Sequence, residues 1–137
     1  MLELSGHFER ELASLTAIAA LVDAFVQRSG AGAEAAFPLQ FAAEELFTNM
    51  VKYNPGGRSA IRVVLRLEAG DVQMDLTDFD TDPFDVTAAP EVDTTLPAQA
   101  RSVGGLGLHL TRKLMDQLEY RYDGRTAIIR LRKHLRT

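Results

Sequence analysis

Gly104-Gly105-Leu106-Gly107-Leu108 opens the stretch that decides the fold, because an amphipathic helical pattern follows it directly. Glycines at the start of a helix let the backbone approach a ligand with no Cβ in the way. They also leave the first helical N–H groups pointing outward, where the helix dipole favours an anion. The stretch therefore predicts a helix start that binds phosphate.

Upstream, Glu45 and Asn49 lie four residues apart in another segment with helical periodicity. Positions i and i+4 share one face of a helix, so we expect the two side chains side by side. An Asn amide offers a neutral oxygen to a hard cation such as Mg²⁺, and a Glu carboxylate offers a base. Each also has an ordinary alternative, a solvated carboxylate for Glu45 and a surface amide for Asn49. Together with the glycines, the pair indicates a nucleotide site.

Length and composition are those of one globular domain, and we expect residues 1–137 to form it. The net charge of −4 argues against broad binding to nucleic acid or to anionic membranes. There is no cysteine, which excludes disulfides and thiolate chemistry. We expect no secretory signal, and no apolar run approaches the roughly 20 residues that span a bilayer. These features predict a cytoplasmic protein.

Apolar periodicity predicts the elements of the fold. We expect strands at 2–6, 61–68, 72–77, around 120–122 and at 126–133, and helices from 12 to about 30, at 38–53 and at 106–118. Ala69-Gly70-Asp71 and Asp123-Gly124 predict tight turns between strands. The segment at about 86–103 has no period, which is typical of a lid. The order predicts an α+β two-layer sandwich, with one mixed or antiparallel sheet covered on one face by helices.

Three ordered motifs resemble those of the GHKL ATPases with the Bergerat fold, and most closely the small RsbW-like anti-sigma-factor serine kinases. The motifs are Glu45-Leu46-Phe47-Thr48-Asn49, the stretch DFDTDPFD from Asp78 to Asp85, and Gly104 to Leu108. The resemblance covers essentially the whole chain. It implies that the predicted sandwich is the histidine-kinase-like ATPase fold.

The resemblance also implies a function. Such a protein uses ATP and Mg²⁺ to phosphorylate a serine on a small STAS-domain antagonist. It binds and silences a sigma factor or another regulator when the antagonist is unavailable, an arrangement called partner switching. The resemblance allows a homodimer, and neither nucleic acid nor a membrane is expected as a partner. The alternative is a catalytically degenerate member of the same fold that docks partners.

By the resemblance, Glu45 is the general base and Asn49 is the Mg²⁺ ligand. Asp78 accepts a hydrogen bond from the adenine amino group, although a turn-forming Asp is also expected after a strand. Thr126, on the last strand, lies near the adenine.

The phosphates have further candidate contacts. In the family, backbone N–H groups of the third motif wrap them, which here means Gly104, Gly105, Leu106, Gly107 and Leu108. Lys52 reaches a phosphate or is an ordinary surface lysine. Arg101, in the predicted lid, meets the γ-phosphate or is a solvated loop charge.

One motif departs from the family. The usual Asp-x-Gly is replaced by Asp78-Phe79-Asp80, and the stretch before Pro83 is one residue longer. The missing glycine normally lets the backbone pass close to the adenine. An aspartate adds a negative charge beside an anionic ligand, and we expect it to cost about 1–2 kcal/mol of binding free energy. Asp80 is the alternative adenine-reading residue, and this altered motif favours the degenerate alternative.

Overall fold

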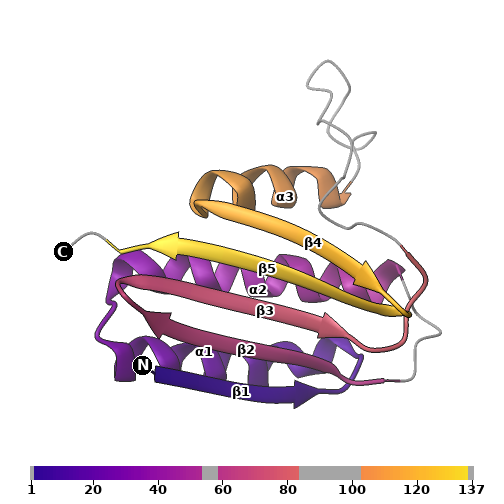
Figure 1. Ribbon diagram of the computed structural model, residues 1–137, viewed down its shortest axis with the longest axis horizontal. Helices are drawn as coiled ribbons and strands as arrows, with labels where there is room; N and C mark the ends of the chain where they lie inside the picture. Colours follow the sequence, from indigo (N-terminus) through magenta and orange to yellow (C-terminus); the bar gives the residue numbers. More distant parts are fainter. Residues whose placement is uncertain (1, 54–58, 84–102, 136–137) are drawn as a thin grey trace.

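The structure is a computed structural model that describes residues 2–53, 59–83 and 103–135. Within these residues, a five-stranded sheet in the order β1-β2-β3-β5-β4 is covered on one face by helices (Figure 1). The elements are β1 (Leu2–Phe8), the 3-10 turn η1 (Leu12–Ser14), α1 (Leu15–Ser29), α2 (Ala33–Tyr53), β2 (Ile61–Glu68), β3 (Asp71–Asp78), α3 (Val103–Leu114), β4 (Gln117–Asp123) and β5 (Thr126–His134). The predicted α+β sandwich is confirmed, and neighbouring strands pair antiparallel throughout.

Both predicted tight turns are present. Ala69 and Gly70 connect β2 to β3, and Gly124 and Arg125 connect β4 to β5. All four have positive φ, between 53° and 82°, which is the backbone of the two-residue hairpin turn that matches strand twist. These turns set the register of the sheet.

The core lies between the sheet and the helices. Residues of β3 alternate, so that Val72, Met74 and Leu76 face the helices with no exposed surface. The second helix contributes a buried apolar stripe, and its members are Leu39, Ala43, Leu46 and Met50. Each fully buried large apolar side chain contributes about 1.5–3 kcal/mol of transfer free energy.

The first helix begins later than predicted. Leu12 lies in η1 and is 56% exposed, and α1 starts at Leu15. The expectation that no apolar run approaches the length of a membrane span is corrected, because among the described residues Leu12–Ser29 is long and apolar enough to cross a membrane. A core helix passes the same test, and Ile18, Val22 and Phe25 of this segment are at most 1% exposed within the core. Packing in the core accounts for its apolar stripe.

The second helix begins earlier than predicted, at Ala33 instead of Pro38. The N–H groups of Ala35 and Ala36 donate to the carbonyl of Gly32 at 3.2 and 3.1 Å, which forms a first turn. Alanine is the best helix former, so this segment is helical before the proline is reached. Near the helix start, Pro38 removes one hydrogen bond without ending the helix.

The third helix ends at Leu114, and its predicted extension to Leu118 is wrong. Lys133 Nζ donates to the Leu114 carbonyl at 3.1 Å and satisfies the helix end. Leu118 lies in β4, opposite Leu131 of β5. Leu118 lies four residues after Leu114, which fits a helix, and two residues before Tyr120, which fits a strand. Its pairing with β5 places it in the strand. Of the predicted lid at about 86–103, residues 86–102 lie outside the described residues.

Candidate functional site

Glu45 and Asn49 lie one turn apart on α2, and their side chains are hydrogen-bonded. Nδ2 of Asn49 donates to Oε1 of Glu45 at 3.2 Å. Asn49 is 4% exposed, which excludes a surface amide. With the amide nitrogen turned toward Glu45, Oδ1 of Asn49 accepts from no donor among the described residues. That oxygen is of the type a hard cation takes as a ligand.

Gly107 of α3 lies against the carboxyl group of Glu45. A Cβ added at Gly107 would collide with Cδ and both carboxyl oxygens of Glu45, so only glycine fits there without a shift. Leu108, 4% exposed, anchors this part of α3 in the core. The Thr111 hydroxyl donates to the Gly107 carbonyl at 2.9 Å. The predicted base and the glycine motif therefore meet, although 62 residues separate Glu45 from Gly107 (107 − 45).

The electrostatics of Glu45 suit a base. Burial raises the pKa of its carboxyl group above the ordinary value of 4.5. The hydrogen bond from Asn49 opposes this rise, the neighbouring charge of Glu44 adds to it, and the charge of Lys52 opposes it. A carboxylate with a raised pKa is a stronger proton acceptor when it is ionised. Lys52 is exposed and acts on the site through its charge.

The glycines lie within α3 and not ahead of it, which corrects their predicted position. The helix begins at Val103, so Gly104, Gly105 and Leu106 belong to its first turn. The first four N–H groups of a helix have no partner inside it and form its positive end. Gly104, Gly105 and Leu106 are therefore among the first four N–H donors, whereas Gly107 and Leu108 lie beyond them. Contact of these groups with phosphate stays a prediction. Arg101 lies outside the described residues.

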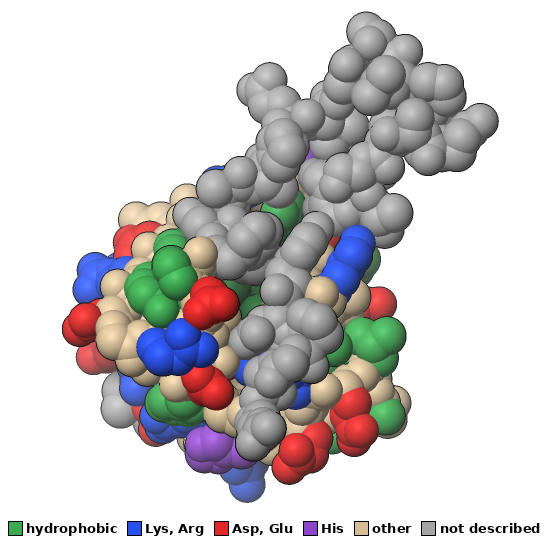
Figure 2. Space-filling model, turned by 90° about the vertical axis from the view of Figure 1, so that its right-hand side faces the viewer, with side chains coloured by type: hydrophobic (Ala, Val, Ile, Leu, Met, Phe, Trp, Pro, Cys, Tyr) green, Lys and Arg blue, Asp and Glu red, His purple; other side chains and the backbone are tan. Residues whose placement is uncertain are grey.

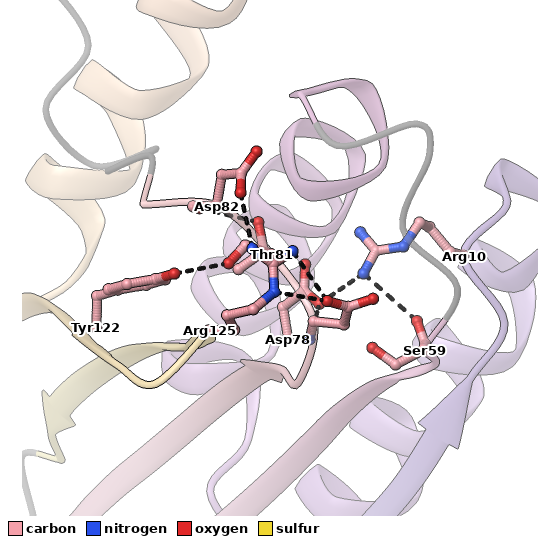
Figure 3. Close-up of polar contacts among 8 residues, drawn as sticks. Arg10, Ser59, Asp78, Thr81, Asp82, Tyr122 and Arg125 are labelled. Atoms are coloured by element: carbon pink, nitrogen blue, oxygen red, sulfur yellow. Dashed lines mark hydrogen bonds and ion pairs between the residues drawn. The ribbon is translucent and has the colours of Figure 1, made fainter.

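Asp78 is the last residue of β3, and its side chain is held inside the protein (Figure 3). It shares the helix-facing side of the sheet with Leu76 and is 2% exposed. Arg10, between β1 and η1, donates from a guanidinium nitrogen to Oδ1 of Asp78 at 2.6 Å. The backbone N–H of Asp80 donates to the same oxygen at 3.2 Å. No sequence motif indicated Arg10.

Asp80, which replaces the family's glycine, is paired with a cation. Arg125 in the β4–β5 turn bonds the carboxylates of Asp80 at 2.9 Å and Asp82 at 2.8 Å. Thr81 links the end of β3 to the β4–β5 hairpin (Figure 3). Its N–H donates to the Arg125 carbonyl at 3.0 Å, and its carbonyl accepts from the Tyr122 hydroxyl at 2.9 Å. The expected penalty from Asp80 is therefore reduced by Arg125. Of the two candidate adenine readers, the buried one is Asp78.

Thr126 is not brought beside Asp78. Side chains alternate along β5, and its buried members are Ala127, Ile129 and Leu131. Thr126 therefore points to the other face of the sheet. Ala127 is the residue that pairs with Asp78, so a methyl group lies opposite Asp78 on the helix-facing side of the sheet.

Figure 2 views the end of the molecule at which β3 ends and the β4–β5 hairpin turns. Acidic and basic side chains are mixed around the residues drawn in grey, and neither sign dominates the described part of this face.

A family model for the histidine kinase-like ATPase domain matches residues 8–133. The chain belongs to this family. No curated protein sequence matches it. Among solved structures, the crystal structure of the RsbU and RsbW domains of Rv1364c from Mycobacterium tuberculosis is similar, with a TM-score of 0.71 and 14% identity.

That structural match covers 98% of this chain and 32% of the other chain. At this level of identity the likeness shows the fold. The GHKL, RsbW-like fold implied by the three sequence motifs is thereby confirmed.

Proposed function

We propose that the chain is an ATP-binding serine-protein kinase of the anti-sigma-factor type. It phosphorylates a serine of a STAS-domain antagonist and sequesters a sigma factor or another regulator. The observation that carries the proposal is the contact between the Glu45–Asn49 pair of α2 and Gly107 of α3. A base and an amide oxygen of α2 lie there against the helix whose first turn offers N–H donors, and phosphoryl transfer depends on such positioning.

Family membership supports ATP as the nucleotide, and the similar structure supports partner switching as the type of regulation. Membership of the histidine kinase-like ATPase family supports ATP. The RsbW domain in the similar structure supports the partner-switching branch, as does the wording of the three motifs.

The residues present fit a Mg²⁺ ion that the protein and the nucleotide coordinate together. Among the described residues, no group of three His, Asp or Glu side chains could hold a metal ion alone. Mg²⁺ commonly takes one or two protein ligands and completes its shell with waters and substrate phosphates. Asn49 is the ligand we assign, through Oδ1. When bound, the ion neutralises charge on the phosphate oxygens.

The chain itself supplies a base and a donor set. Glu45 accepts the proton of the partner's serine hydroxyl, and its burial strengthens it for this role. Gly107 allows the carboxylate to lie directly against α3. The N–H groups in the first turn of α3 donate to phosphate oxygens and stabilise negative charge.

Transfer of label from γ-labelled ATP tests the proposal. The substrate is a purified STAS-domain protein, and we expect label on one serine. Asn49→Ala is expected to abolish transfer while circular dichroism and thermal unfolding stay close to those of the wild type. A fully active Asn49→Ala variant would refute the metal assignment.

A docking module without catalysis is the second candidate, and two observations favour it. The carboxylate of Asp78 already engages Arg10, and Asp80 stands at the position of the family's glycine. Partner affinity measured with and without Mg·ATP separates the candidates. Tight binding that is indifferent to nucleotide, with no transfer of label, would favour docking.

A further inference from the structure

Arg10 joins three separate parts of the candidate site. Its side chain is 5% exposed, although it lies in the connection between β1 and η1. One guanidinium nitrogen donates to the Met50 carbonyl at 3.3 Å, and the other to the Ser59 carbonyl at 3.4 Å and to Asp78 Oδ1 at 2.6 Å (Figure 3). Met50 follows Asn49 on α2. Arg10 thus ties the helix that carries the proposed base and metal ligand to the strand end that carries Asp78.

The contact with α2 has a physical reason. The last four carbonyls of a helix have no partner within it, and the Met50 carbonyl belongs to this set because α2 ends at Tyr53. A planar guanidinium holds several acceptors in one fixed geometry, which a lysine ammonium does not. Arg10 can therefore fix the position of Asp78 relative to α2.

The hydrogen bonds to Asp78 are unequally shared between its two oxygens. Arg10 and the N–H of Asp80 both donate to Oδ1. Oδ2 accepts from no donor among the described residues. An ionised carboxylate can only accept, so Oδ2 suits a ligand that presents an N–H group and repels one that presents an oxygen.

We infer that Arg10 is a positioning residue for base selection: it fixes the Asp78 carboxylate so that Oδ2 selects a purine that carries a 6-amino group over one that lacks it. The inference rests on the proposed function, since it assumes that a nucleotide enters beside Asp78. Arg10 does not touch the nucleotide and acts through Asp78. Its loss should therefore affect recognition of the amino group more than binding of the phosphates.

Two nucleotides test this assignment by calorimetry: ATP, and purine riboside triphosphate, which lacks the 6-amino group. A hydrogen bond to a charged acceptor is worth about tenfold or more in affinity, so the wild type should prefer ATP by about that factor. In Arg10→Met, we expect the preference to fall below about threefold through weaker ATP binding, with the analogue's Kd changed by less than about twofold. An equal loss for both nucleotides, or an unchanged preference, would overturn the assignment.

Control variants keep the test decisive. Arg125→Met makes the same substitution at an exposed arginine that pairs with Asp80 and Asp82, and it should change both affinities alike, leaving the preference intact. Arg10→Met leaves Asp78 buried and unpaired, which can prevent folding. Arg10→Lys retains the charge, and there we expect the preference to fall at least about threefold, because the ammonium lacks the fork that fixes the carboxylate.

A wild-type preference in Arg10→Lys would count against the assignment. Absence of ATP binding by the wild type would instead overturn the proposed function and this inference together, whereas binding with a preference insensitive to Arg10 overturns the inference alone.

Discussion

Replacing Gly107 by alanine should separate activity from stability. The added Cβ would collide with the carboxyl group of Glu45. The colliding atoms are the far end of a flexible side chain, so Glu45 can turn away while the backbone of α3 stays in place. We therefore expect the substitution to move the proposed base and to leave the fold intact.

The magnitude follows from two opposing contributions to the free energy of unfolding. Alanine within a helix is favoured over glycine by about 0.8–1.0 kcal/mol. Displacing Glu45 into a poor rotamer costs about 0.5–1.5 kcal/mol. These two nearly cancel, and loss of the Asn49–Glu45 hydrogen bond costs about 1 kcal/mol more, so the stability of Gly107→Ala should lie within about 2 kcal/mol of that of the wild type. A misplacement of about 1 Å in a catalytic group can cost about 10²-fold in rate.

Intrinsic ATP hydrolysis, in which water replaces the partner's serine, is the assay, with denaturant unfolding as the measure of stability. We expect hydrolysis by Gly107→Ala to fall about 10²-fold. In a Glu45→Ala background, the same substitution should add no further loss, because the group it displaces is gone.

Two results would refute this reasoning. Wild-type hydrolysis by Gly107→Ala would show that the position of Glu45 against α3 does not matter for the reaction. A loss of more than about 3 kcal/mol of stability would show that Glu45 cannot yield to the new methyl group.

Three further predictions follow from the same contacts. Asn49→Ala should lose about 1 kcal/mol of stability with its hydrogen bond, and its ATP affinity should no longer respond to removal of Mg²⁺ by EDTA; a wild-type response would exclude Asn49 as the ligand. Burial raises the pKa of Glu45, so the ionised carboxylate costs stability as pH rises above 4.5. Glu45→Gln lacks this cost, and urea unfolding should show its advantage over the wild type growing with pH; a constant difference contradicts the assignment. Arg125→Met removes the cation that pairs with the carboxylates of Asp80 and Asp82, so ATP binding should weaken, and the loss should shrink as salt is added; a loss that is independent of salt argues against a charge effect.

The sheet was predictable because its signals are local. Two-residue alternation gave the strands, and glycines that tolerate positive φ gave the turns at Gly70 and Gly124. Helix ends were less predictable. Pro38 signals a helix start, yet the alanines before it are helical. Leu118 fits both the helical period and the two-residue strand period, and only its pairing with β5 places it in a strand.

The site was predicted where residue spacing alone brings groups together. Glu45 and Asn49 needed only the helical repeat. Arg10 carries no such signal, because its partners lie 40, 49 and 68 positions along the chain. The contact of Thr126 with the adenine stays a prediction, because in a strand a shift of one residue moves a side chain to the opposite face, and Ala127 occupies the inward position.

Calorimetric titration of the wild-type chain with ATP and excess Mg²⁺ tests most directly whether α2 and α3 bind a nucleotide between them. The account predicts saturable heat from one site per chain, and a melting temperature that rises with ATP as RT ln(1 + [L]/Kd) requires. No heat and no thermal protection at millimolar ATP would contradict it.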